Sequence, residues 1–158
     1  MTDSEQHSRQ SCLDAAYRYL AYRPRSRLEL ERYLAKKGCA DAGSIMDELA
    51  QKGLLDDAAF ARFWRSNRDS FHPRSRSILR SELRAKGVSA DIIDEVLIDV
   101  DDMATAYEAA ARKARRYRSE EYEVFRRRIG MFLRRRGFSH EVAQAAMQRL
   151  WEEGGESA

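Results

Sequence analysis

The chain has 158 residues, of which 43% are hydrophobic and 35% are charged, and its formal net charge is +3. This length fits one ordinary domain or a short repeat array, and the high charged fraction indicates a large exposed surface. No apolar run approaches the ~18 residues of a membrane span, and the first seven residues lack the basic and apolar regions of a secretory signal. We therefore expect a cytoplasmic protein that makes no membrane contact.

Helical patterns fill the chain between two polar ends. We expect a disordered tail over residues 1–11 and a C-terminal tail over residues 154–158. Apolar residues between them recur at helical spacing. This spacing predicts helices over about 12–22, 26–38, 43–52, 57–68, 74–86, 89–97, 103–117 and 122–136, and a last one opened by Ser139. No segment alternates with period two for long enough to form a strand, so the predicted fold class is all-α.

Several residues mark where these helices begin and end. Ser26 and Glu29 have the spacing of a capping box, in which each side chain satisfies a free backbone N–H group. Gly38 is expected to end its helix in the left-handed conformation. Asp56 and Asp57 are expected to cap the helix that follows them, in preference to acting as paired catalytic carboxylates.

A segment ending in glycine occurs three times. In each copy two aliphatic residues lie four apart and are followed by three residues that include Lys or Arg, then Gly. The glycines Gly38, Gly87 and Gly137 are spaced by 49 and 50 residues. Such a period indicates one supersecondary unit used three times. We predict three tandem three-helix repeats, over residues 12–55, 56–101 and 102–153, that form an elongated, curved array.

The repeat alignment also predicts the core. One turn before each glycine lies an aliphatic residue on the apolar face, and we expect Leu34, Leu83 and Leu133 to be buried. An array of this kind favours an extended surface that contacts a large partner over a pocket-centred enzyme.

Residues with catalytic or metal-binding chemistry are scarce. His7, His72 and His140 are isolated, and the two cysteines have no metal-ligand spacing. We expect Cys12 and Cys39 to be free thiols in a reducing cytoplasm. We predict no catalytic residues, no metal and no cofactor.

The charges are unevenly distributed. Residues 91–102 hold six acidic residues and no basic one, whereas residues 112–136 hold eleven basic residues and three acidic ones. Arg76, Arg80 and Arg84 lie at i, i+4 and i+8 and form one stripe. Like charges at this spacing repel each other, so the stripe suits an anionic or acidic partner. The alternative is a solvated helix face, and the sequence leaves both open.

Five segments, in their order and spacing, resemble the RecX family of bacterial regulators of the RecA recombinase, over about residues 12–151. The segments are Arg25 to Leu30, Lys37-Gly38, Gly53 to Ala61, Pro73 together with Glu82 to Val88, and Leu133 to Ser139. One departure is Ser70-Phe71-His72 before Pro73, where the family usually has Gly-x-Gly-Pro or a similar sequence.

The resemblance implies a non-enzymatic, monomeric regulator that binds the RecA nucleoprotein filament in its helical groove. It implies inhibition of the recombinase, ATPase and co-protease activities, and so modulation of recombination, DNA repair and the SOS response. Contact with single- and double-stranded DNA is expected to be weaker or indirect. The residues expected to carry the RecA or DNA contact are Arg74, Arg76, Arg80, Arg84, Lys86, Arg112, Arg115, Arg116, Arg127, Arg128, Arg134 and Arg135.

Other functions compete with this one. A non-specific DNA-binding helical protein without a recombinase partner would bind duplex DNA equally well with or without RecA. A protein scaffold would use its basic residues only for solubility. An enzyme is the least supported class, because the chain has no phosphate loop, dinucleotide fingerprint or nucleophile-and-base set.

Overall fold

The fold is that of a computed structural model, which describes residues 2–117 and 120–155. Within these residues every regular element is a helix, so the all-α class is confirmed. The helices are α1 (Asp3–Tyr22), α2 (Arg27–Lys36), α3 (Ala42–Gln51), α4 (Asp57–Phe71), α5 (Arg76–Ala85), α6 (Ala90–Val96), α7 (Asp102–Ala114), α8 (Tyr122–Arg135) and α9 (His140–Gly155). None of these described helices is long and apolar enough to cross a membrane.

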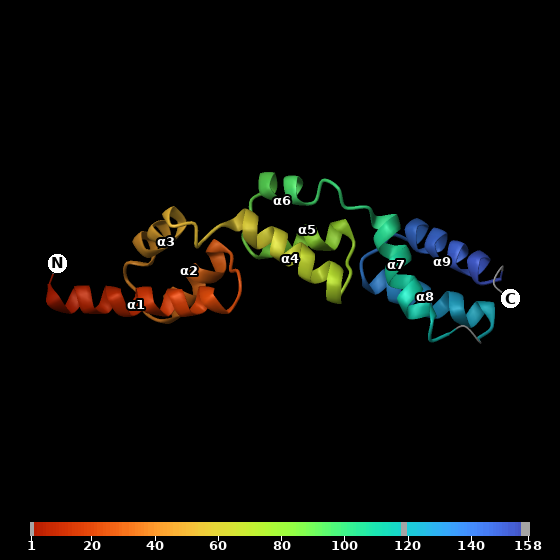
Figure 1. The fold of residues 1–158 in the computed structure, drawn as a ribbon, viewed down its shortest axis with the longest axis horizontal. Coiled ribbons are helices and arrows are strands. Elements are labelled where there is room, and N and C mark those ends of the chain that lie inside the picture. The colour runs from red at the N-terminus through yellow and green to blue at the C-terminus, as the bar shows by residue number, and fades with distance from the viewer. Residues whose placement is uncertain (1, 118–119, 156–158) are drawn as a thin grey trace. The chain divides into compact units, whose positions relative to one another are not determined.

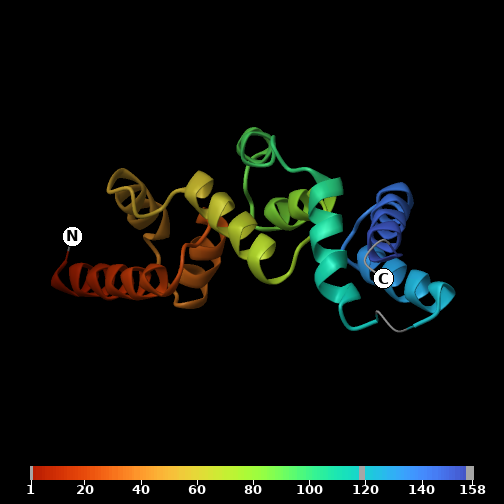
Figure 2. The ribbon, with the colours of Figure 1, turned by 45° about the vertical axis from the view of Figure 1, so that its right-hand side comes forward.

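The helices form three successive groups of three, which confirms the predicted repeats. In the first group α1 packs against α2 and α3 (Figure 1), around a core that includes Leu30, Leu34 and Ile45. In the last group α7, α8 and α9 pack on one another (Figure 2), around Ile129 and Leu133 and several alanines of α7. The small alanine side chains allow the helix backbones to approach closely.

The repeated glycine ends the middle helix of each group as predicted. Gly38, Gly87 and Gly137 have φ angles of +73°, +78° and +87°, the left-handed region that glycine adopts without steric cost. Leu34 and Leu83, one turn before the first two glycines, are 0% exposed, and so is Leu133 before the third. The repeat alignment therefore places the core correctly.

The described chain divides into two compact units that do not coincide with the repeats. The first unit contains the residues up to Trp64 together with Glu82–Val96, and the second contains Arg65–Ser81 together with the residues from Leu97 onward. The second repeat is thus shared between the units. Two of the three boundaries fall inside α4 and α5, and the third falls at the end of α6.

Each unit contains one region where consecutive repeats contact each other, which we call a joint. The two joints are built alike. At the first joint the N–H of Arg27 donates to Asp57 Oδ1 at 2.8 Å, and a Cβ on Gly87 would lie 2.7 Å from Leu28 Cβ. At the second joint the N–H of Arg76 donates to Asp102 Oδ1, also at 2.8 Å. A Cβ on Gly137 would lie 2.1 Å from Ile78 Cγ1. Each repeat therefore caps the middle helix of the repeat before it and packs a glycine turn against that helix.

The N-terminal residues are helical, where a disordered tail over residues 1–11 was expected. Helix α1 begins at Asp3 because Thr2 and Glu5 form a capping box. Arg9 then ties the helix to α3 through ion pairs of 3.2 Å to Asp41 and 2.8 Å to Glu48. The Thr2 and Glu5 spacing is a local signal that the prediction did not use, whereas the Arg9 contacts join residues more than thirty positions apart and have no local signal.

The two cysteines form a disulfide, and the expectation of free thiols was wrong. Cys12 on α1 and Cys39, just after the glycine that ends α2, have Cα atoms 6.0 Å apart and are bonded through their sulfurs. No spacing along the chain indicates this pair, because only the packing of α1 on α2 brings the two residues together. The bond closes a loop around the core of the first repeat.

Candidate partner-binding surface

Helix α8 presents one apolar face and one basic face. Phe125, Ile129 and Leu133 are buried in the core of the last repeat. Because a helix turns by about 100° per residue, Arg127 and Arg134 point away from this core, and both are exposed. The buried face of α8 therefore fixes the direction in which its arginines project.

Most of the basic residues around α8 have no carboxylate partner. Within residues 2–117 and 120–155, no ion pair joins an acidic side chain to the exposed residues Arg115, Arg116, Arg127, Arg134 and Arg135. Three neighbours are weakly paired, and one of them is Arg126, which lies 3.9 Å from Glu123. Arg112 lies 4.0 Å from Glu108, and Arg128 lies 3.6 Å from Glu120. The region predicted from the charge run is thus a positive surface that acidic side chains of the described residues neutralise only in part.

The α5 stripe is divided between the two units. Arg76 and Arg80 are half-buried residues of the second unit, whereas Arg84 is an exposed residue of the first. Arg76 also uses its backbone N–H at the second joint. Arg84 is therefore the most accessible of the three predicted side chains.

Lys86 is engaged within the first unit. Its ammonium donates to Glu29 Oε1 at 2.9 Å and lies 5.2 Å from the ring centre of Trp64. Burial alone would raise the pKa of Glu29, but hydrogen bonds from Arg23, Lys86 and the Ser26 N–H outweigh it and lower that pKa to about 2. Lys86 therefore stabilises the first joint, and the Glu29 carboxylate already compensates its charge.

A second group of arginines lies at the second joint. Arg74 donates through Nη1 to the carbonyl of Arg135 at 3.2 Å, and the N–H of Ser75 donates to the carbonyl of Arg136 at 3.0 Å. Two guanidinium nitrogens, Arg74 Nε and Arg136 Nη1, are buried without a hydrogen-bond partner. Burial, together with the charges of Arg74 and Arg68, lowers the pKa of Arg136.

Arg74 is among the predicted contact residues, whereas Arg136 and Arg68 are not. Arg136 is the C-cap residue of α8, immediately before the glycine turn. The signal that would have found it is the repeat itself. Arg136 precedes Gly137 as Lys86 precedes Gly87, and Lys86 was already a candidate.

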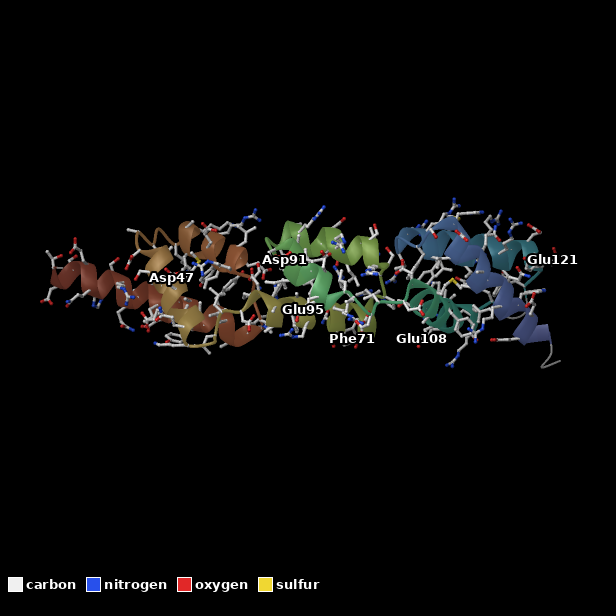
Figure 3. All side chains as sticks on the ribbon, turned by 90° about the horizontal axis from the view of Figure 1, so that it is seen from above. Asp47, Phe71, Asp91, Glu95, Glu108 and Glu121 are labelled. Carbon is white, nitrogen blue, oxygen red and sulfur yellow. A yellow bond between two sulfur atoms is a disulfide. The ribbon has the colours of Figure 1, made fainter. Side chains whose placement is uncertain are left out.

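At the C-terminal end of the acidic segment, residues 91–102, the carboxylates mainly hold the fold together. Asp101 Oδ1 accepts hydrogen bonds from the first N–H groups of α7, Asp102 holds the second joint, and Asp99 pairs with Arg65. Asp91 and Glu95 are exposed on α6 (Figure 3). No three His, Cys, Asp or Glu side chains in the described parts of the chain are grouped to hold a metal ion.

Family models match most of the chain. The first three-helix domain of RecX matches residues 12–42, the second matches residues 56–97, and the third matches residues 99–147. The three matches fall on the three groups of helices described above.

The chain is also similar to RecX proteins over most of their length. The chain is 38% identical over 146 residues to the regulatory protein RecX of Mycobacterium avium, covering 88% of this chain and 82% of that protein. It is 31% identical over 152 residues to the regulatory protein RecX of Chlorobium limicola, covering 95% and 96%. The crystal structure of RecX from Lactobacillus salivarius has the same fold, with a TM-score of 0.74 and 23% identity, over 92% of this chain and 97% of that one. The chain belongs to the RecX family of regulatory proteins.

Proposed function

We propose that this chain binds the RecA–DNA filament and inhibits the recombinase, ATPase and co-protease activities of RecA. In this way it would modulate recombination, DNA repair and the SOS response in the cytoplasm. The observation that carries the proposal is the group of exposed arginines on α8 and directly after α7 that have no carboxylate partner in the described chain. The choice of RecA as the partner rests on membership of the RecX family.

The physical basis is charge-assisted hydrogen bonding. A RecA filament carries DNA phosphates and acidic side chains, and guanidinium groups bind both with paired N–H donors. Binding through Arg127 and Arg134 breaks no ion pair within the described protein, so no internal ion pair has to be replaced when the contact forms. Such contacts weaken as salt rises because they release bound counterions.

The test is ATP hydrolysis by the host RecA on single-stranded DNA, measured with and without this protein. The wild type is expected to slow hydrolysis, and less so as salt rises. The double variant Arg127→Glu with Arg134→Glu is expected to inhibit poorly while keeping its helical circular dichroism spectrum, because neither side chain contributes to the core.

A matched control carries the same change of charge elsewhere. Arg18→Glu with Arg62→Glu alters two exposed arginines of the first unit and is expected to inhibit like the wild type. Equal inhibition by all three proteins would show that the α8 arginines are solvated surface only. Tight DNA binding by the wild type, with no effect on RecA, would instead favour a DNA-binding protein without a recombinase partner.

A further inference from the structure

The first repeat carries a stack of aromatic and basic side chains where α1 packs on α2. The rings of Tyr19 and Tyr33 are stacked, with an interplanar angle of 1° and centres 4.1 Å apart. The Cζ atom of Arg25 lies 4.0 Å from the same Tyr19 centre. Two groups cannot share one ring face at this distance, so Tyr33 and Arg25 cover opposite faces of Tyr19. The inner part of the stack is therefore filled.

Tyr22 lies at the outer end of this stack and is open to solvent. It is 85% exposed, more than any other large hydrophobic residue that the structure describes. Its ring centre lies 5.8 Å from Arg25 Cζ, and Arg25 is oriented by donating from Nε to the Tyr19 carbonyl at 3.3 Å. An accessible aromatic ring thus lies next to a guanidinium group whose position is fixed.

The basic residues along the stack have no acidic partner. Within residues 2–117 and 120–155, no ion pair joins a carboxylate to Arg25, Lys36 or Lys37. Lys37 is exposed, and its ammonium lies 5.7 Å from the ring centre of Tyr33. At about 100° per residue, Lys36 and Lys37 flank Tyr33 on α2, whereas Glu31 points to the opposite side. The positive charge beside the rings is therefore free to meet an anionic ligand.

We propose that this surface binds single-stranded nucleic acid, with a base stacked on the ring of Tyr22 and phosphates bound by Arg25 and Lys37. Aromatic rings beside basic residues bind single strands without sequence preference, because every base has a flat π face. Guanidinium groups pair with phosphate oxygens through two N–H donors. The exposed ring and the unpaired cations therefore match the two parts of one ligand.

Other ligands use only part of this surface. The bases of a duplex are already stacked on one another, so Tyr22 has no base to receive. An acidic peptide would bind the cations and leave the ring uncovered. The site differs from the one in the proposed function, which lies on and around α8 and acts on RecA, and it needs no recombinase.

The experiment compares two ligands that carry the same phosphates. One is a labelled oligothymidylate, and the other is a strand of equal length without bases. Tyr22→Ala removes the ring and Tyr22→Phe keeps it, while Phe71→Ala removes a ring that is 70% exposed in the second unit. Each change is made in the wild type and in the variant Arg127→Glu with Arg134→Glu, so that binding through α8 cannot mask the effect.

The expected results separate stacking from charge. Tyr22→Ala is expected to bind oligothymidylate about tenfold more weakly and to bind the strand without bases as its parent does. Tyr22→Phe and Phe71→Ala are expected to bind both ligands as their parents do. Lys37→Gln is expected to weaken both ligands alike and to reduce their salt dependence. Melting curves establish that each variant is folded, and Tyr22→Ala is expected to keep the parent's melting temperature because its side chain is exposed.

Three results would overturn the proposal. The first is oligothymidylate binding that Tyr22→Ala leaves unchanged in both backgrounds. The second is an equal loss for the two single strands or for a duplex, which would mean that no base is stacked. The third is a defect seen only in binding to the RecA filament, which would assign Tyr22 to a protein contact. Inhibition of RecA is not measured in these titrations, so the site and the proposed function can fail separately.

Discussion

The ammonium of Lys86 lies 2.9 Å from a carboxylate oxygen of Glu29 and closes the first joint between repeats. Glu29 is also held by Arg23 at 2.8 Å and by the N–H of Ser26 at 3.1 Å. One carboxylate thus ties the start of α2 to the turn that ends α5. Because its side chain is only 11% exposed, its ionisation is coupled to the folding of the first unit.

This coupling predicts an acid-sensitive first unit. The pKa of Glu29 falls from 4.5 to about 2 on folding, so its ionised form stabilises the folded state. The stabilisation is fully present above about pH 4.5 and is lost as the pH falls toward 2. At about 1.4 kcal/mol per pKa unit, the size of this stabilisation is on the order of 3 kcal/mol. The measurement is urea unfolding between pH 7 and pH 2.5, followed by Trp64 fluorescence in a Trp151→Phe background.

Two variants isolate the contribution of this residue. Glu29→Gln is expected to flatten the pH dependence in this range, whereas Glu31→Gln, on the exposed side of α2, is expected to leave it unchanged. If the Glu29→Gln curve runs parallel to that of the wild type, the acid sensitivity arises elsewhere.

The glycine turns predict a difference between two similar substitutions. Gly38 and Gly87 have nearly the same φ, +73° and +78°, but a Cβ at Gly38 meets nothing within 4 Å, whereas one at Gly87 meets Leu28 Cβ at 2.7 Å. Gly38→Ala is expected to cost about 1 to 2 kcal/mol, for the left-handed conformation alone. Gly87→Ala is expected to cost about 1 to 3 kcal/mol more, because Leu28 must move. Urea unfolding of the first unit gives both values, and equal losses would mean that Leu28 moves aside freely.

The disulfide predicts that stability depends on reduction. Cys12 and Cys39 enclose a loop with a sequence separation of 27 residues. In the chain-entropy account, closing such a loop stabilises the folded state by about 3 to 4 kcal/mol. Dithiothreitol is expected to lower the melting temperature of the first unit in the wild type and to have no effect on Cys12→Ser. Thiol titration of the unfolded, unreduced protein is the check, and two reactive thiols would contradict the bond.

The last repeat predicts a contrast between neighbouring positions of α8. Leu133 is 0% exposed and Met131 is 43% exposed. Leu133→Ala is expected to destabilise the second unit by about 2 to 5 kcal/mol, and Met131→Ala is expected to change little. Trp151 reports on this unit, because its ring lies 5.5 Å from that of Phe125. A small loss at Leu133 would mean that the surrounding alanines close the cavity.

The repeat architecture could be predicted from the sequence because its signals are local. The capping box at Ser26 and the glycine at the end of each middle helix act within one or two turns. Contacts between distant segments could not be predicted in this way. The Cys12–Cys39 bond and the Arg9 ion pairs depend on how α1 lies on its neighbours, and no spacing along the chain encodes that.

The basic surface was predictable in part for the same reason. The helical period correctly separates Arg127 and Arg134 from the buried face of α8, since both properties belong to one helix. It could not show that Lys86 is paired with Glu29, or that Arg136 lies near Arg74, because these partners are brought together only at the joints.

The division of the second repeat between two compact units bears on how the protein could be dissected. A single cut after residue 55 or residue 101 would follow the sequence repeat, yet it would separate Asp57 from the N–H of Arg27, or Asp102 from that of Arg76. A fragment that ends at a repeat boundary would therefore lose one backbone hydrogen bond at the start of its last middle helix, and the fragment that follows would have a glycine turn without the helix that it packs against. The smallest piece expected to fold alone is larger than the repeat that the sequence displays, and limited proteolysis should release no stable single repeat.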